Sequence, residues 1–511
     1  MKRILKKYIM PAILIAGLSL TSCSDFLERS PLGELTEDDA PAGVNQGRVF
    51  KIYGLMRSYN ITAGIPAFAI HNMRSEDSEK GSEEGDGADQ AAFFDNFEYN
   101  ASNGVLGAYW NQNFTIIQNC NSLISDIETV ETKTKQDTIN YGEAKFFRAY
   151  AFFNLVRAFG DVPKLDFKIT ESSQGNIPKS PAADIYTRID ADLEDAVKYL
   201  PTRWGNEYIG RLTWGAARSL QARTYMMRND WTKMLAASRE VINSGFYNLS
   251  TPYDKIFTDA GENSPESIFE LQCTATAAKP NSTDIGSQFA EVQGVRGSGQ
   301  WNLGWGWHMA TTELMNKAYE AGDPRKDATL LYFRRQVGDV IPPITPETTN
   351  TPFGESPVSR AMGAAFNKKA YSDPTLRKQF ANSGFWINIR LIRYSDVLLM
   401  AAEASNELGM NSDALNYLEQ VRSRARGKDT SILPKVTTSN QVDLRDAIRH
   451  ERRVELGLEP DRFYDLVRWG IAAEVLHAAG KTKYQDKHAL LPIPQTEIDK
   501  SGGILVQNPN F

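Results

Sequence analysis

A pattern rich in aromatic and aliphatic residues at helical spacing runs from Gly142 to Phe159. At about 100° per residue, its aromatic and aliphatic side chains fall on every side of a helix and leave no polar face. A helix that is apolar all round is normally buried in a large core. Gly160 and Pro163 follow, and both residue types end helices. The pattern therefore predicts a buried central helix that ends at Gly160.

Apolar residues recur at helical spacing in several other segments, which we also expect to be helices. These are residues 48–59, 106–127 and 184–200, the pair 213–228 and 231–244, and the pair 395–408 and 412–425. The first helix of each pair is rich in alanine, and small residues let paired helices nest as they do in tetratricopeptide repeats. The central helix and 184–200 would form a third pair. We therefore expect a mainly α fold with a helical-hairpin scaffold.

Two long segments lack a sustained period, and we expect them to form an irregular lobe with a few short strands. The expected division places the helical core at about 45–60, 104–245 and 390–470, and the lobe at about 61–103 and 250–389. Together these segments would form one domain, from residue 23 to residue 511.

The first irregular segment carries an acidic run from Glu76 to Gly87. Calcium prefers several carboxylates on a tight turn. With Asp77 as position 1, however, Ala88 falls at position 12 of an EF-hand loop, where a glutamate is needed. The spacing favours a solvated acidic loop over a calcium site, and no cofactor is expected.

The N-terminus has the layout of a secretory signal. A basic start is followed by an apolar run from Ile9 to Leu20, which is too short to span a bilayer, and then by Thr21, Ser22 and Cys23. Small residues directly before a cysteine resemble a lipobox, in which residues 1–22 are removed and Cys23 is lipidated. The alternative is an ordinary signal with an incidental cysteine.

The remaining composition bears on partners and on redox state. The chain has a formal net charge of −6, and removal of a leader with four basic residues would make it more negative. Nucleic acid is therefore not expected as a partner. Cys120 and Cys273 are the remaining cysteines, and we expect two buried thiols, although an oxidising compartment would permit a bridge.

Charged residues are unusually dense between Asp443 and Gly470. They lie among apolar residues, and arginine suits bidentate pairing with carboxylates. The pattern predicts a structural charge network at a helix crossing rather than a catalytic site. Its expected members are Glu451, Arg452, Glu455, Arg462 and Asp465.

Five separated blocks carry a resemblance to a known family. They are the lipobox start, the central helix E-A-x-F-x-R-A-Y-x-F-F-N-L-V-R-x-F-G-D-V-P, the segments Ile389–Ala404 and Glu451–Gly470, and a closing L-P-I-P with Q-N-P at 491–494 and 507–509. In this order they resemble the SusD/RagB family of surface lipoproteins. One departure is Glu459-Pro460-Asp461, where the family usually has Glu-Gly.

The resemblance implies a role as well as a fold. It implies a tetratricopeptide-like scaffold with an irregular ligand-binding lobe, anchored to the outer membrane through lipid on Cys23 and exposed at the cell surface. It also implies that the protein captures an oligosaccharide or polysaccharide and delivers it to a SusC-like TonB-dependent transporter. Family members that resemble RagB take peptides, which leaves a peptide ligand as an alternative.

No common catalytic motif occurs in the sequence, and the five histidines are scattered without zinc spacing. We therefore expect a binding protein and not an enzyme. A surface glycoside hydrolase needs two carboxylates about 5 to 9 Å apart, which a sequence cannot rule out. A purely structural scaffold for transporter assembly is a further alternative.

An aromatic stretch is the strongest candidate for the binding site. Trp301, Trp305 and Trp307 lie within seven residues on a glycine-rich loop. Flat aromatic faces suit sugar rings, and nearby polar groups suit their hydroxyls. The alternative for each tryptophan is to hold the loop on the core. Arg74 and Asp77 are candidates for hydroxyl contacts, since the resemblance implies that the site is built partly from the region before the first core helix.

Overall fold

The central helix is α6, which spans Lys135–Phe159 in the computed structural model. The structure describes residues 44–82, 85–87, 90–296, 303–332, 365–380 and 383–511. Thr134 and Asp137 form a capping box at the start of α6, and Gly160 ends it with φ 75°. Nearly every residue after Ile139 is buried, because α6 packs against α5 (Gly104–Glu128) and α7 (Ala182–Tyr199). The predicted buried helix is confirmed.

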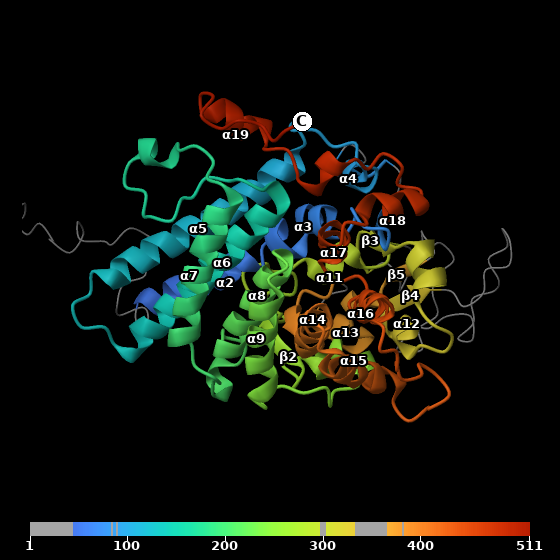
Figure 1. Ribbon diagram of the computed structural model, residues 1–511. Coiled ribbons are helices and arrows are strands. Elements are labelled where there is room, and N and C mark those ends of the chain that lie inside the picture. Colours follow the sequence, from blue (N-terminus) through green and yellow to red (C-terminus); the bar gives the residue numbers. More distant parts are fainter. Residues whose placement is uncertain (1–43, 83–84, 88–89, 297–302, 333–364, 381–382) are drawn as a thin grey trace, which may run out of the picture. The chain divides into compact units, whose positions relative to one another are not determined.

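The paired helices are also confirmed. The first pair is α8 (Trp214–Met227) and α9 (Trp231–Asn243), and the second is α14 (Tyr394–Glu407) and α15 (Asn411–Arg426). The alanine-rich helix α14 also packs on α9 and α16, so the pairs stack into one scaffold (Figure 1). This arrangement fits the nesting of small-residue helices. The fold is mainly α, as predicted.

Three two-stranded antiparallel sheets join segments that are far apart in the sequence. Strand β1 (Ser78–Gly81) pairs with β3 (Trp307–Ala310), β2 (Ser267–Leu271) with β6 (Ile389–Arg393), and β4 (Leu330–Tyr332) with β5 (Ala365–Asn367). The β1–β3 pair joins the two segments of the lobe, and the β2–β6 pair ties the lobe to the strand that leads into α14. The expectation of a few short strands in residues 250–389 is confirmed.

The remaining elements are short, apart from the first and α16. The α-helices are α2 (Val44–Met56), α3 (Ile65–His71), α4 (Ala92–Asp95), α10 (Tyr253–Ile256), α11 (Phe289–Gln293), α12 (Pro324–Thr329), α13 (Pro374–Gln379), α16 (Gln441–Glu455), α17 (Arg462–Arg468), α18 (Ala472–Ala478) and α19 (Gln495–Lys500). Residues Tyr59–Ala63 and Leu314–Ala318 form π-helical turns. None of the helices of the described residues is both long enough and apolar enough to cross a bilayer.

The expectation of an irregular, solvated loop over residues 61–103, before α5, is wrong in part. Helix α3 and strand β1 lie in this segment, and both are too short to produce a visible period. Glu76 and Asp77 are buried rather than solvated, because Arg462 and Arg453 pair with them at 2.6 Å each. The two carboxylates neutralise guanidinium groups that are themselves mostly buried, which stabilises the fold.

The charge network predicted between Asp443 and Gly470 is present, but most of its partners lie elsewhere in the chain. Arg452 contacts Asp465 at 3.3 Å and Asp396 of α14 at 2.8 Å. Glu455 receives three arginines from other elements, Arg325 of α12, Arg393 of β6 and Arg424 of α15. The network therefore ties α16 to both the scaffold and the lobe.

The two closing motifs complete the end of the central helix. Gln507 exchanges hydrogen bonds with the backbone of Ile493 at 2.7 and 2.9 Å. The Leu491 amide donates to the Ala158 carbonyl at 2.7 Å, and the Asn508 amide side chain donates to the Phe159 carbonyl at 2.7 Å. These donors satisfy two carbonyls that the end of α6 leaves without intrahelical partners.

Cys120 and Cys273 are free thiols, and Cys120 is buried as predicted, whereas Cys273 is only half-buried. Burial raises the pKa of the Cys273 thiol to about 11 and that of Cys120 further, so both stay protonated and unreactive at neutral pH.

Candidate functional site

Of the three candidate tryptophans, Trp305 is the one that the structure places at the surface. Its side chain is 36% exposed, whereas Trp307 is 6% exposed and belongs to the main hydrophobic core. Trp307 lies opposite Gly81 in the β1–β3 sheet, with the Lys80 ammonium 5.3 Å from its ring centre. Trp307 therefore holds the loop on the core. Trp301 and the expected lipid-bearing Cys23 lie outside the described residues.

Arg74 and Asp77 are engaged in contacts within the protein. Arg74 is fully buried, donates from Nε to the Ile70 carbonyl at 2.8 Å, and stacks 4.0 Å from the ring centre of Phe463. Asp77 accepts hydrogen bonds from Arg453 Nε at 3.0 Å and Nη2 at 2.6 Å. Both side chains are therefore committed to contacts within the protein, and the candidate site does not include them.

The Trp305 indole is paired with a second aromatic ring, that of Tyr59. The two ring centres are 6.2 Å apart with an angle of 51° between their planes. Tyr59 is half-buried and packs against the main core, and burial raises its phenol pKa, so the hydroxyl is neutral at physiological pH. The two rings make an angled apolar surface that also carries the Tyr59 hydroxyl group. Aromatic surfaces of this kind suit the apolar faces of sugar rings.

The backbone under Trp305 is fixed. Its amide donates to the Glu291 carbonyl at 2.9 Å, and the Gly306 amide donates to the Gly294 carbonyl at 2.8 Å. A Cβ atom on Gly304 would lie 1.9 Å from the Glu291 carbonyl oxygen, so only glycine allows this approach. Trp305 is therefore presented on a rigid support, which reduces the entropy lost when a ligand binds.

Polar groups lie next to this aromatic pair. Arg296 donates to the Ser82 hydroxyl at 2.9 Å and forms an ion pair with Asp86, and the Ser82 hydroxyl donates to Asp86 at 2.6 Å. A Cβ atom on Gly306, the residue after Trp305, would lie 2.9 Å from the Arg296 Cβ atom. The charged pair is about one-third exposed, so it offers both donors and acceptors at the edge of the rings.

Sequence reasoning named Trp305 but missed Tyr59, Ser82, Asp86 and Arg296. Tyr59 is the last residue of the first predicted helix, and Asp86 is one of many charges in an acidic run. No local signal marks them, because three separate segments come together only in the folded chain.

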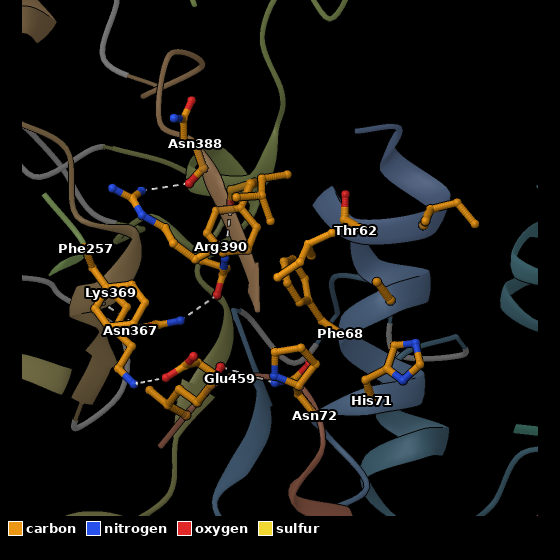
Figure 2. Close-up of a pocket in the computed structure, with 18 of the residues that line it drawn as sticks. Thr62, Phe68, His71, Asn72, Phe257, Asn367, Lys369, Asn388, Arg390 and Glu459 are labelled. Carbon is orange, nitrogen blue, oxygen red and sulfur yellow. Dashed lines mark hydrogen bonds and ion pairs between the residues drawn. The ribbon is translucent and has the colours of Figure 1, made fainter. Parts of the chain in front are cut away.

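An internal cavity lies behind the same region (Figure 2). The turn that carries Tyr59 also lines it through Thr62. Figure 2 shows Phe68 and His71 of α3 on one side, and Lys369, Glu459 and Arg390 on the other. The volume is about 60 Å³, whereas ligand pockets usually measure about 300 to 1,000 Å³. The cavity is large enough for a few water molecules and too small for an oligosaccharide.

The walls of this cavity are held by polar contacts. The Lys369 ammonium lies 2.7 Å from Glu459, and the Asn367 side-chain amide donates to Gln293 at 2.7 Å. Burial lowers the pKa of Lys369 to about 8, against the opposing effect of Glu459. The Lys369–Glu459 pair joins the lobe to the segment after α16, and the Asn367–Gln293 pair joins two segments of the lobe.

Two family profiles match the chain. Residues 265–511 match the SusD family, and residues 51–226 match a family described as starch-binding and associating with the outer membrane. Together the two matches cover most of the chain.

Individual relatives agree with these profiles. The chain is 27% identical to SusD-like protein P2 of Formosa agariphila, over 99% of this chain and all of that protein. A solved laminarin-binding SusD-like protein is 27% identical with a TM-score of 0.75, covering 91% of this chain and 99% of its own. Surface glycan-binding protein A from Bacteroides fluxus is 25% identical with a TM-score of 0.75, covering 92% and 99%. With the profiles, the helical scaffold and the closing motifs all in agreement, the chain belongs to the SusD/RagB family.

Proposed function

We propose that this protein is a glycan-binding lipoprotein of the cell surface, which captures oligosaccharide and delivers it to a SusC-like TonB-dependent transporter in the outer membrane. The observation that carries the binding role is the exposed Trp305 ring, paired with Tyr59 on a rigid support and edged by Arg296 and Asp86. The solved relatives named above support the ligand class, since one binds laminarin and another is a surface glycan-binding protein.

The chemistry required is binding without bond cleavage. A sugar ring would stack on Trp305, and its hydroxyls would exchange hydrogen bonds with the Arg296–Asp86 pair. Because the rings and the ion pair are already held in place, little conformational entropy is lost on binding. A helical face of the scaffold would contact the transporter.

We expect Trp305→Ala to weaken glycan binding about 5- to 150-fold, since an aromatic stacking platform contributes about 1 to 3 kcal/mol. The melting temperature should change little, because Trp305 lies outside the hydrophobic clusters of the described residues. Binding is measured by calorimetry with a glycan panel that includes laminarin and starch.

Trp307→Ala is the matched control for this substitution. It removes the same side chain two residues away, but from the core, and should cost about 3 to 5 kcal/mol of stability. Any molecules that remain folded should bind normally. Unchanged affinity in Trp305→Ala would contradict the proposed platform. Binding of peptides in place of glycans would favour the RagB-like alternative, and released reducing sugar would favour a hydrolase.

The lipid anchor is tested separately. Cys23→Ala should leave the fold intact and release the protein from the outer membrane, because burial of acyl chains in the bilayer provides the attachment. Cys273→Ala, which alters a half-buried thiol of the folded part, should stay membrane-bound. The share of each variant in the membrane fraction is measured in cells that lack the transporter. Retention of Cys23→Ala in the membrane fraction would refute lipidation at this residue.

A further inference from the structure

Helix α8 packs against α9 and β2 (Figure 1). Residues from this region line a second hollow. It is formed by the connection between α7 and α8, the segment after α9, and β2. Its inner part has a volume of about 170 Å³, and an open outer part of about 370 Å³ shares Thr202 and Phe246 with it. We call the two parts together the α8–α9 groove. Unlike the internal cavity, its outer part has the size of a ligand cleft.

Three aromatic side chains line this groove without contributing to a core. Trp204, Trp214 and Phe246 are half-buried, yet none of them belongs to the hydrophobic clusters that the described residues form. Burial against a core is the usual role of large aromatic side chains. Trp305 likewise lies outside these clusters.

Trp204 is held in place by contacts to the protein. Its indole N–H donates to the Leu212 carbonyl at 2.7 Å, and the Arg211 guanidinium lies 4.2 Å from its ring centre. Arg211 is fixed in turn by Glu143 of α6, with a contact of 2.5 Å. Arginine stacking on tryptophan is strong among cation–π pairs. The aromatic wall is therefore already ordered before any ligand arrives.

Arg203 supplies a cation at the entrance of the groove. It is exposed, its guanidinium lies 4.7 Å from the ring centre of Phe246, and it forms no ion pair with the carboxylates of the described residues. The guanidinium therefore lies over one face of Phe246, and the side chain is accessible to solvent. Exposed Thr202 and Asn243 add a hydroxyl and an amide to the same rim.

We propose that the α8–α9 groove is a second carbohydrate-binding site, in which a pyranose ring of an oligosaccharide stacks on Phe246 and the aromatic wall while Arg203 donates to its oxygen atoms. A sugar fits because it needs a flat apolar face together with several donors and acceptors. The site goes beyond the proposed function, since it shares no residue with the Trp305 surface and depends on neither Tyr59 nor Arg296.

The test titrates the full-length protein with laminarin, starch and their hexasaccharides. The variants are Phe246→Ala, Arg203→Ala, Trp305→Ala and the double variant Trp305→Ala with Phe246→Ala. Phe246→Ala should weaken the binding of at least one of these glycans about 5- to 150-fold, the effect of losing a stacking platform. Binding of this glycan in the groove should persist in Trp305→Ala and disappear in the double variant.

Two conservative substitutions separate stacking from folding. Phe246→Tyr keeps an aromatic face and should keep the affinity, whereas Phe246→Leu keeps an apolar side chain of similar size and should behave like Phe246→Ala. Arg203→Ala alters an exposed residue, so it tests the groove even where Phe246→Ala fails to fold.

If no panel glycan loses affinity in either Phe246→Ala or Arg203→Ala, the proposal is overturned. If only Trp305→Ala loses glycan affinity, the proposed function stands and the second site is refuted. If only Phe246→Ala and Arg203→Ala lose glycan affinity, the second site stands and the Trp305 platform is refuted. The two failures are therefore distinguishable.

Discussion

Glu455→Ala should lower the free energy of unfolding by about 3 to 5 kcal/mol, the cost of removing one partner from a buried ion pair. Glu455 is fully buried at the end of α16. Its carboxylate lies 2.5 Å from Arg424, 3.1 Å from Arg393 and 3.3 Å from Arg325. Removing it leaves three guanidinium groups in the interior with one carboxylate fewer to neutralise them.

The matched control is Glu419→Ala on α15. Glu419 pairs with Arg426 at 2.9 Å, but both side chains are partly exposed. Such pairs contribute about 0 to 1 kcal/mol, so the control should unfold nearly as the wild type does. Chemical denaturation followed by circular dichroism measures both. Equal losses in the two variants would show that burial does not set the importance of Glu455.

Acid should destabilise the protein steeply below about pH 4. Burial alone would raise the pKa of Asp396, but Arg223 and Arg452 outweigh it and hold that pKa at about 2. Glu455 is also held at about 2, by Arg424, Arg393 and Arg325. Since each folded pKa is below the unfolded value of about 4, each carboxylate stabilises the fold above that pH. This stability, about 3 kcal/mol for each, is lost as the pH falls from about 4 to about 2.

Two variants assign the acid transition to its source. Asp396→Asn should make the loss of stability between pH 4 and pH 2 smaller, because one titrating group is gone. Burial raises the pKa of Glu262 to about 7, so its protonation in the folded state is complete above this range. Glu262→Gln should therefore leave the loss of stability between pH 4 and pH 2 unchanged. A wild-type unfolding free energy that stays constant from pH 4 to pH 2 would contradict the assignment.

The scaffold could be predicted because its signals are local. The two hairpins repeat apolar residues every three or four positions, whereas α6 carries apolar residues on every side and ends at Gly160 as predicted. The family resemblance came from these same segments. Helix α3 and strand β1 could not be predicted, because seven and four residues are too few for a period.

The candidate site was predictable only in part, for a related reason. Three tryptophans in one stretch drew attention to the right region, but the sequence cannot tell a surface ring from a core ring. Trp305 and Trp307 differ because β3 turns Trp307 toward the core, and that strand exists only through its pairing with β1. The Arg296–Asp86 pair and the α8–α9 groove likewise depend on contacts between distant segments.

The contact between the end of α6 and Asn508 also affects when this protein can become fully folded. The carbonyl of Phe159 and the amide that satisfies it are 349 positions apart. During synthesis and secretion, the central helix is made long before residues 491 and 508 emerge, so its end stays open to water and to other chains. A molecule cut after Gln507 would keep every helix and strand yet expose that end. Loss of residues 508–511 would thus leave the Phe159 carbonyl without this donor in a chain whose helices are otherwise complete.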